Sequence, residues 1–166
     1  AALWAASYLV LQLGVPEAEV AGYGSLFYVG ITAGRAVSGF VTMKLSDRQM
    51  IRLGAAIVIL GVLAVQVAPG VTVTLAGLLL IGIGFGPVFP AVIHSVPDRF
   101  GSTYSADLTG YHMGGAFTMG YIAQLSFGYV AVLTGYGILP FILLGMILGV
   151  YILHGITIRI LRSAKG

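Results

Sequence analysis

The sequence predicts an all-α integral membrane protein, a bundle of six helices of which the first is truncated. Composition leads to this fold class: the 166 residues are 58% hydrophobic, with a mean hydropathy of +1.03, and only 8% are charged. A soluble chain of this length cannot cover so much apolar surface. The 25 glycines are typical of membrane helices, in which close backbone approach replaces the hydrophobic effect as the source of packing energy.

Five apolar segments are long enough to cross a bilayer, for which roughly 20 apolar residues span about 30 Å of hydrocarbon. They are Gly22–Met43, Leu53–Ala68, Val71–Val96, Asp107–Leu133 and Ile138–Arg159. A sixth apolar run, residues 1–13, is too short to cross and lacks the charged start and cleavage site of a signal peptide. We expect it to be the end of a helix that begins before residue 1, in a longer protein.

The basic residues fall on one side of the predicted bundle. Lys44, Arg48 and Arg52 share one loop, Arg99 lies two loops further on, and three more basic residues lie in the C-terminal tail: Arg159, Arg162 and Lys165. The alternate loops contain no Lys or Arg. The positive-inside rule then predicts that these loops and the C-terminus are cytoplasmic, and we expect a multi-pass protein of the inner membrane. The +3 net charge follows these loops, which argues against a nucleic-acid partner.

One cytoplasmic loop carries a recognisable motif. Asp47, Arg48 and Arg52 match the aspartate, the arginine and the last basic position of the pattern Gly-x-Leu-x-Asp-Arg-x-Gly-Arg-Arg, and Leu45 matches its leucine. In this loop, and in its helix count and orientation, the chain resembles the major facilitator superfamily.

Departures from the motif point to one half of such a transporter. Met43, Met50 and Ile51 stand where the pattern has Gly, Gly and a basic residue, which resembles the second copy of the loop, between helices eight and nine. The resemblance implies that residues 1–166 are the C-terminal half, helices seven to twelve, of a twelve-helix fold. Its N-terminal half would be the missing partner. The glycine motifs at 34–39 and 84–90 resemble the fucose-permease-related branch.

The loop residues Asp47, Arg48 and Arg52 are expected to form a conformational switch. Asp47 lies where one helix ends and the next begins, so its carboxylate can accept hydrogen bonds from backbone N–H groups of the following helix. Such a latch favours one helix arrangement by the few kcal/mol that a switch needs. The alternative is that these residues only anchor the turn among lipid headgroups.

Arg35 is the most costly charge in the predicted bundle. It lies about 13 positions into a span of about 22, near the bilayer centre, where a charge costs at least ~2.5–3.5 kcal/mol on insertion scales. Its guanidinium therefore has to face protein or water. We expect it close to the solute path, where it binds substrate, or in a structural ion pair or carbonyl cap.

The segment Asp107–Leu133 concentrates polar side chains inside a span. The candidate substrate-binding residues on it are Tyr111, His112, Thr118, Tyr121 and Gln124. Tyr111 and Thr118 are two helical turns apart, and Tyr121 and Gln124 follow about one and two turns beyond, so we expect them on nearly one side, facing a cavity. His112 either relays protons or donates to substrate, or is neutral and bonded to a neighbouring helix.

Packing and flexibility are predicted from glycine and proline. Gly110 and Gly114 are expected to form a close-packing pair, whereas the stretches 53–65 and 138–149 lack strongly polar side chains and should face lipid. Gly86, Pro87 and Pro90 weaken one helix near the membrane centre, which predicts either a gate or a static kink. Phe85 and Phe89 on that helix offer aromatic surface for a sugar or ordinary core packing.

These observations predict a secondary transporter half that moves a small polar solute by alternating access. The branch resemblance suggests a sugar, and the coupling ion is left open. One alternative is a half-size protein that dimerises into a transporter or pore. Another is an intramembrane serine protease that uses Ser25 and His112. We expect no enzyme activity, no cofactor and no metal, since no two histidines have ligand spacing on one helix. The expected partners are a small-molecule substrate, the lipid bilayer and the missing half.

Overall fold

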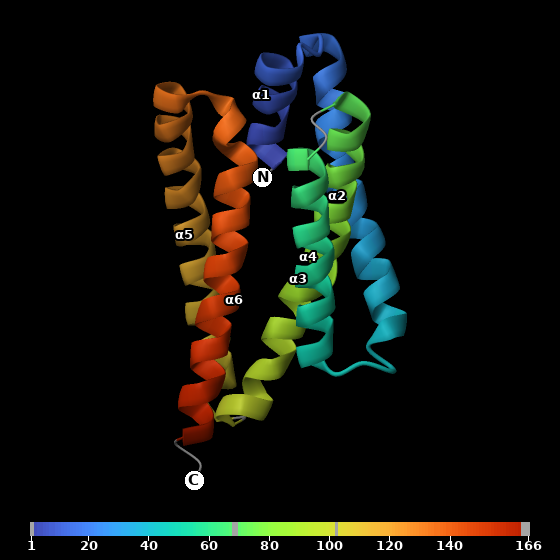
Figure 1. Ribbon diagram of the computed structural model, residues 1–166. Helices are drawn as coiled ribbons and strands as arrows, with labels where there is room; N and C mark the ends of the chain where they lie inside the picture. Colours follow the sequence, from blue (N-terminus) through green and yellow to red (C-terminus); the bar gives the residue numbers. More distant parts are fainter. Residues whose placement is uncertain (1, 68–69, 102, 164–166) are drawn as a thin grey trace.

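The computed structural model describes residues 2–67, 70–101 and 103–163, and this part of the chain folds into a bundle of helices (Figure 1). The helices are α1 (Ala2–Leu13), α2 (Glu17–Val41), α3 (Asp47–Val67), α4 (Val71–Phe100), α5 (Ser105–Thr134) and α6 (Leu139–Ser163), with a short 3-10 helix, η1 (Tyr136–Ile138), before α6. Every regular element in these ranges is helical, which confirms the predicted all-α class.

Three of the helices are long and apolar enough to cross a membrane: α3, α4 over Val71–Asp98, and α5. The predicted span within α2 is not among them, and that helix carries Glu17, Glu19 and Arg35. In the predicted span Ile138–Arg159, the described apolar stretch is Tyr136–Val150, which is shorter than the 18 residues required of a span. By composition, then, the described helices fit a membrane protein.

Four of the basic residues that predict the cytoplasmic side lie wholly or partly outside the described structure. Lys165 is not among the described residues, and the side chains of Arg99, Arg159 and Arg162 are likewise outside them.

Two helices begin earlier than the apolar pattern predicts. α2 starts at Glu17 rather than Gly22, directly after Pro16, and α3 starts at Asp47 rather than Leu53. Both first turns contain acidic residues, whose charge is favourable beside the N-terminal end of the helix dipole. A polar first turn extends a helix beyond its apolar stretch, so hydrophobicity alone places the start too late.

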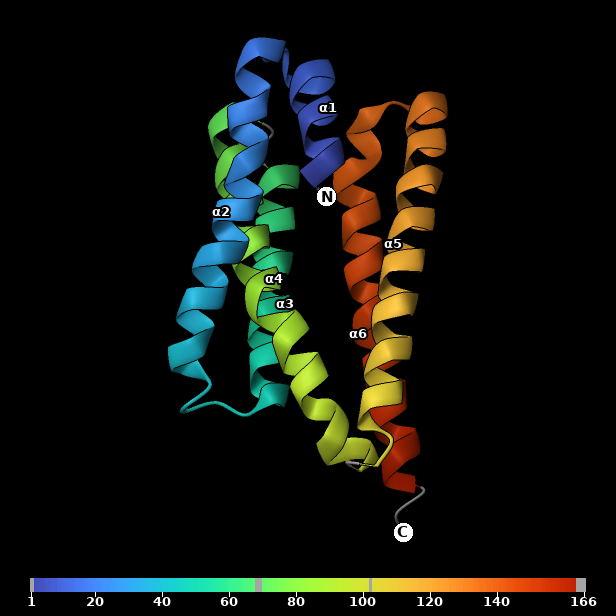
Figure 2. The same cartoon turned by 180° about the vertical axis from the view of Figure 1, so that it is seen from behind.

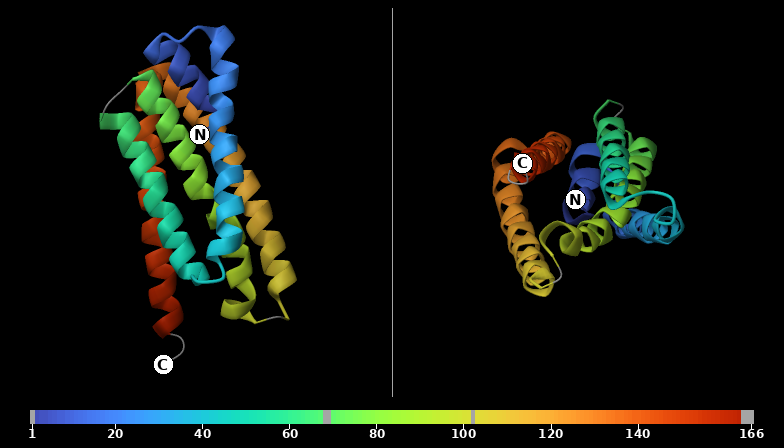
Figure 3. Two further views of the ribbon diagram at one scale, coloured as in Figure 1. Left: turned by 90° about the vertical axis from the view of Figure 1, so that its right-hand side faces the viewer. Right: turned by 90° about the horizontal axis from the view of Figure 1, so that it is seen from below.

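The helices form two groups. α2, α3 and α4 make one block, α5 and α6 lie on the other side of the molecule, and α1 lies between the two groups at one end (Figures 1 and 2). α5 and α6, named the α5–α6 pair, meet at η1 and diverge away from it (Figure 3). The view from below shows the same separation, with α5 and α6 to one side and the block to the other (Figure 3).

Glycines bring α2 and α4 into backbone contact. Gly30 and Gly34 of α2 face Gly82 and Gly86 of α4. A Cβ on Gly82 would lie 3.0 Å from the Gly30 Cα, and a Cβ on Gly86 would lie 2.9 Å from the Gly34 Cα. No side chain fits at this separation, so two facing small-xxx-small pairs fix the distance between the helices.

A second set of glycines holds α3 against α4. A Cβ on Gly54 would lie 2.5 Å from the Gly84 carbonyl oxygen, and a Cβ on Gly61 would lie 2.8 Å from the Gly77 carbonyl oxygen. Each helix thus places two glycines seven residues apart on the contacting face, which is two helical turns. α4 is therefore in close contact with a neighbour on two sides, and the block α2–α4 is a tightly packed unit.

α1 connects the block to the α5–α6 pair through larger side chains. Leu9 is completely buried and packs with Leu78 of α4. Tyr8, at the preceding position, packs with Phe127 of α5. The Trp4 ring lies 5.0 Å from the Phe127 ring. These contacts bury two sides, about 100° apart, of a helix of only 12 residues.

Two packing predictions are corrected by the fold. A Cβ added at Gly110 or Gly114 would meet nothing within 4 Å, so the close-packing glycines are those of α2, α3 and α4 instead. The stretch 53–65 does not simply face outward, because Val58 and Val62 are buried against α4. Helix polarity fails as a guide here because backbone proximity, and not side-chain polarity, decides which faces meet.

Candidate functional site

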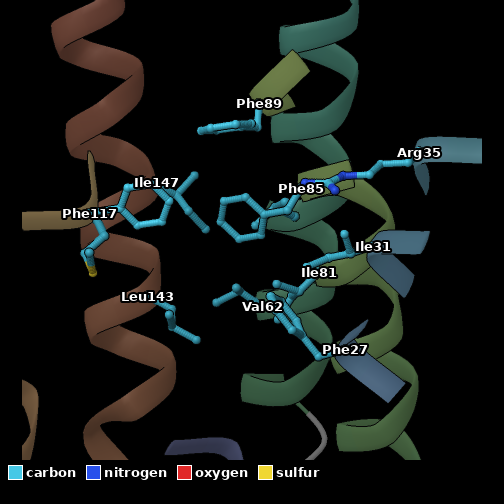
Figure 4. Close-up of a pocket in the computed structure, with 12 residues that line it drawn as sticks. Phe27, Ile31, Arg35, Val62, Ile81, Phe85, Phe89, Phe117, Leu143 and Ile147 are labelled. Atoms are coloured by element: carbon cyan, nitrogen blue, oxygen red, sulfur yellow. The ribbon is translucent and has the colours of Figure 1, made fainter. Parts of the chain in front are cut away.

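A cavity of about 490 Å³ lies between the two helix groups. Its lining residues are Phe27, Ile31 and Arg35 from α2, Val58 and Val62 from α3, Ile81, Phe85 and Phe89 from α4, Phe117 from α5, and Leu143, Met146 and Ile147 from α6. Figure 4 shows Phe85 and Phe89 projecting from α4 toward Ile147 on α6. The volume of the cavity lies within the usual range for small-molecule sites, about 300–1,000 Å³.

The floor of the cavity is a packed apolar cluster. Val58, Val62 and Ile81 are buried together, and Leu143 and Ile147 of α6 pack against them. α6 therefore forms one wall of the cavity, which corrects the prediction that 138–149 faces only lipid. The contact of Leu143 and Ile147 with this cluster closes the cavity between α6 and the block.

Arg35 is the single charged residue in this lining. It lies in the C-terminal third of α2, closer to one end of the helix than the predicted midpoint. Its backbone N–H lies 2.8 Å from the Cβ position of Gly86, so the α2–α4 contact fixes where its side chain begins. Figure 4 shows the guanidinium reaching from α2 toward Phe85.

Arg35 has no carboxylate partner among the described side chains, where the one ion-pair contact joins Asp47 to His94. The predicted structural ion pair is therefore not found there. Arg35 is exposed at the edge of the cavity, so its guanidinium can bind an anion in the space beside it.

The α5 side chains divide between two sides of the helix. Among the described residues, Phe117 is the α5 residue that lines the cavity. At about 100° per residue, Tyr121 and Gln124 lie within about 40° of Phe117, on the same side. Both are exposed, Tyr121 by 66%.

Tyr111, His112 and Thr118 lie elsewhere on α5. The same helical geometry places them about 100–140° from Phe117, and all three are exposed. The four residues expected on one side, Tyr111, Thr118, Tyr121 and Gln124, thus spread over about 140° of the helix. The structure brings none of Tyr111, His112 and Thr118 to the cavity lining. Their part in substrate binding stays a prediction.

The predicted gate lies inside an unbroken helix. Pro87 is buried and Pro90 is exposed, and α4 continues through both. The carbonyl oxygen of Ile83, which loses its helical donor at Pro87, lies against Gly34 of α2. Gly86 packs on the same helix. Pro87 therefore lies at the close α2–α4 contact, and its action as a gate stays a prediction.

The loop that carries the predicted switch is held by a capping interaction that the sequence analysis did not predict. The Ser46 N–H donates to Gln49 Oε1 at 2.9 Å, and the Ser46 hydroxyl donates to the same oxygen at 3.0 Å. This is part of a capping box, for which Ser followed by Gln three residues later was the available signal.

The switch residues themselves are placed differently from one another. Asp47 Oδ2 lies 3.8 Å from Nδ1 of His94 on α4, so the carboxylate faces a side chain of the neighbouring helix. Arg48 has a buried Nε without a hydrogen-bond partner in the described structure, and Arg52 is exposed. Asp47 is thus the member that contacts a second helix.

The enzyme alternative gains no geometric support. Ser25 lies on α2 and donates to the Gly22 carbonyl oxygen, whereas His112 lies on α5, at the other side of the molecule (Figure 1). In the described residues, no group of three or more His, Cys, Asp or Glu side chains is placed to hold a metal ion.

Comparisons with protein families, curated proteins and solved structures found no match for this chain.

Proposed function

We propose that this chain is one half of a secondary transporter, the C-terminal half of a major facilitator fold in an inner membrane, with its C-terminus in the cytoplasm. The observation that carries the proposal is the cavity of about 490 Å³ between the α2–α4 block and the α5–α6 pair. It lies between two helix groups, where a change in their relative position opens or closes it.

Two further features support the proposal. The block is a unit of close glycine contacts, whereas α6 meets it through larger side chains such as Leu143 and Ile147. A closely packed block suits alternating access, in which groups of helices move as rigid units. Asp47 of α3 lies 3.8 Å from His94 of α4 at the loop end, where a switch acts on helices already in contact.

Much of α5 is exposed and requires a cover. Tyr111 and Phe117 are 79% and 74% exposed, and among the described residues of this helix only Phe127 and Ala131 are buried. The N-terminal half of the same transporter is the proposed cover. A second copy of the chain is the alternative, and the mass of the purified natural protein in detergent distinguishes one long chain from a dimer.

Single-cysteine labelling tests alternating access directly. The chain has no cysteine, so Phe85→Cys, in the natural protein, gives one reactive thiol at the cavity. We expect a membrane-impermeant thiol reagent to label it in both right-side-out and inside-out vesicles. Leu60→Cys, 62% exposed on α3 but outside the cavity lining, is the control and should stay unlabelled within lipid. Labelling of Phe85→Cys from one side only, under all conditions, contradicts the proposal.

A further inference from the structure

We infer that the cavity takes an organic monocarboxylate with an apolar, preferably aromatic, body. The inference relies on the proposed function only in taking this cavity as the solute path. It replaces the sugar that the branch resemblance suggests.

The lining argues against a polyhydroxylated solute. Apart from Arg35, every lining side chain is apolar, and four of them are phenylalanines. Most helical backbone groups already bond within their own helix, and the Ile83 carbonyl, which Pro87 deprives of its donor, lies against Gly34. The hydroxyls of a sugar would therefore lose their water without gaining partners, and each unpaired buried polar group is costly.

Arg35 supplies the recognition of an anion. A guanidinium presents a planar set of donors that matches a carboxylate in a bidentate geometry. Because no carboxylate pairs with Arg35 among the described side chains, its charge is free for a ligand. One cation balances one negative charge, and Arg35 is the one charged residue of the lining, so a monoanion suits the site better than a phosphate dianion.

The rest of the cavity fits the body of such a ligand. Phe85 and Phe89 stand on one wall, and Ile147 faces them from α6 (Figure 4). Flat aromatic faces and branched aliphatic side chains contact a ring well. A ligand whose carboxylate lies at Arg35 thus places its apolar part between α4 and α6, in contact with both helix groups.

Binding of 1-naphthoate tests the inference independently of transport. Equilibrium dialysis of the natural protein in neutral phosphatidylcholine nanodiscs, against empty nanodiscs, should show saturable binding of 1-naphthoate. Its neutral analogue 1-naphthamide should bind at least about tenfold more weakly, a difference of about 1.4 kcal/mol, and excess D-glucose should not compete. Equal affinity for 1-naphthoate and 1-naphthamide, competition by D-glucose, or no saturable binding overturns the inference.

Variants locate the site. Arg35→Gln should weaken 1-naphthoate binding at least about tenfold and leave 1-naphthamide unchanged, whereas Arg35→Lys keeps the preference for the anion. Lys44→Gln, which removes an exposed charge outside the cavity lining, should change neither. An equal loss for both ligands in Arg35→Gln, or an equal effect of Lys44→Gln, overturns the role of Arg35.

Filling the cavity separates this site from partition into lipid. Ile147→Trp should abolish 1-naphthoate binding, and Leu60→Trp, outside the cavity lining, should not. Unchanged binding in Ile147→Trp overturns the inference. If cysteine labelling is one-sided while these binding results hold, the transporter proposal fails and the carboxylate site stands. If labelling alternates without a preference for 1-naphthoate, the reverse is true.

Discussion

The glycine contacts predict opposite effects for two identical substitutions on α2. Gly30→Ala places a methyl group against the Leu79 carbonyl oxygen, 3.0 Å from the Gly82 Cα and 3.0 Å from the Ile83 nitrogen. All three are backbone atoms of α4, so none moves unless the helix moves. Gly24→Ala, also on α2, meets nothing within 4 Å. The pair therefore isolates the close helix contact from the general effect of adding a methyl group.

The magnitude follows from the space available. Ordinary van der Waals contact begins at 3.4 Å, so the methyl group of Gly30→Ala needs about 0.4 Å more from two neighbours and more again from the Leu79 carbonyl. Overpacking of this kind costs about 1–3 kcal/mol. Alanine regains about 0.4–1 kcal/mol over glycine in a helix. We therefore expect a net loss of about 1–2 kcal/mol for Gly30→Ala and a gain of about 0.4–1 kcal/mol for Gly24→Ala.

Unfolding by SDS in mixed micelles, followed by far-ultraviolet circular dichroism, measures both free energies of unfolding. Equal changes in the two variants would refute the reasoning, because α2 and α4 would then not be in backbone contact at Gly30. The same outcome would remove the support that the rigid block gives to alternating access.

Two further predictions use matched variants of other contacts. Leu9 is 0% exposed and Leu11 is 61% exposed. Leu9→Ala should therefore lower the free energy of unfolding by about 2 kcal/mol. This is at the low end for a core leucine, because a side chain that leaves the core for lipid does not lose the free energy of transfer from water. Leu11→Ala should change it by less than ~0.5 kcal/mol, and equal losses would contradict the burial of α1. Trp4 is the only tryptophan, and Gly128→Val should shift its fluorescence emission because a Cβ there lies 3.0 Å from the ring. Gly120→Val, which meets nothing within 4 Å, is the control, and an unchanged spectrum in both variants would show that Trp4 does not pack on α5.

The helices were predictable because membrane-like composition leaves few other folds. A long apolar run satisfies its backbone only as a helix or in a closed barrel, so the runs that became α3, α4 and α5 were placed to within a few residues, apart from their polar first turns. The early start of α3 at Asp47 had a signal in Ser46 and Gln49 that hydrophobicity does not contain.

The cavity was predictable only in part. Arg35 and the aromatic pair Phe85 and Phe89 were singled out by their chemistry, and all three line the cavity. The polar residues of α5 were singled out for the same reason, yet only Phe117 of that helix reaches the lining. The polarity of a side chain predicts that it avoids lipid, but it does not predict whether that side chain faces the cavity, a neighbouring helix or another protein surface.

The facing glycines show the same division. The four-residue spacings Gly30–Gly34 and Gly82–Gly86 are visible in the printed sequence, as is the pair Gly110–Gly114. The pairs Gly30–Gly34 and Gly82–Gly86 contact each other, whereas a Cβ added at Gly110 or Gly114 would meet nothing within 4 Å. A spacing shows that a helix offers a flat face, whereas contact requires a second flat face at the same height, which is a property of the assembled bundle.

For this protein, then, the sequence by itself determined the helices, their apolar character and the presence of one costly arginine within them, because these follow from local composition and backbone hydrogen bonding. Only the tertiary structure decided that Arg35 borders an apolar cavity without a carboxylate partner among the described side chains. The physical reason is that an ion pair or a cavity depends on which helices come together, and here that is set by backbone contacts at glycines far apart in the chain.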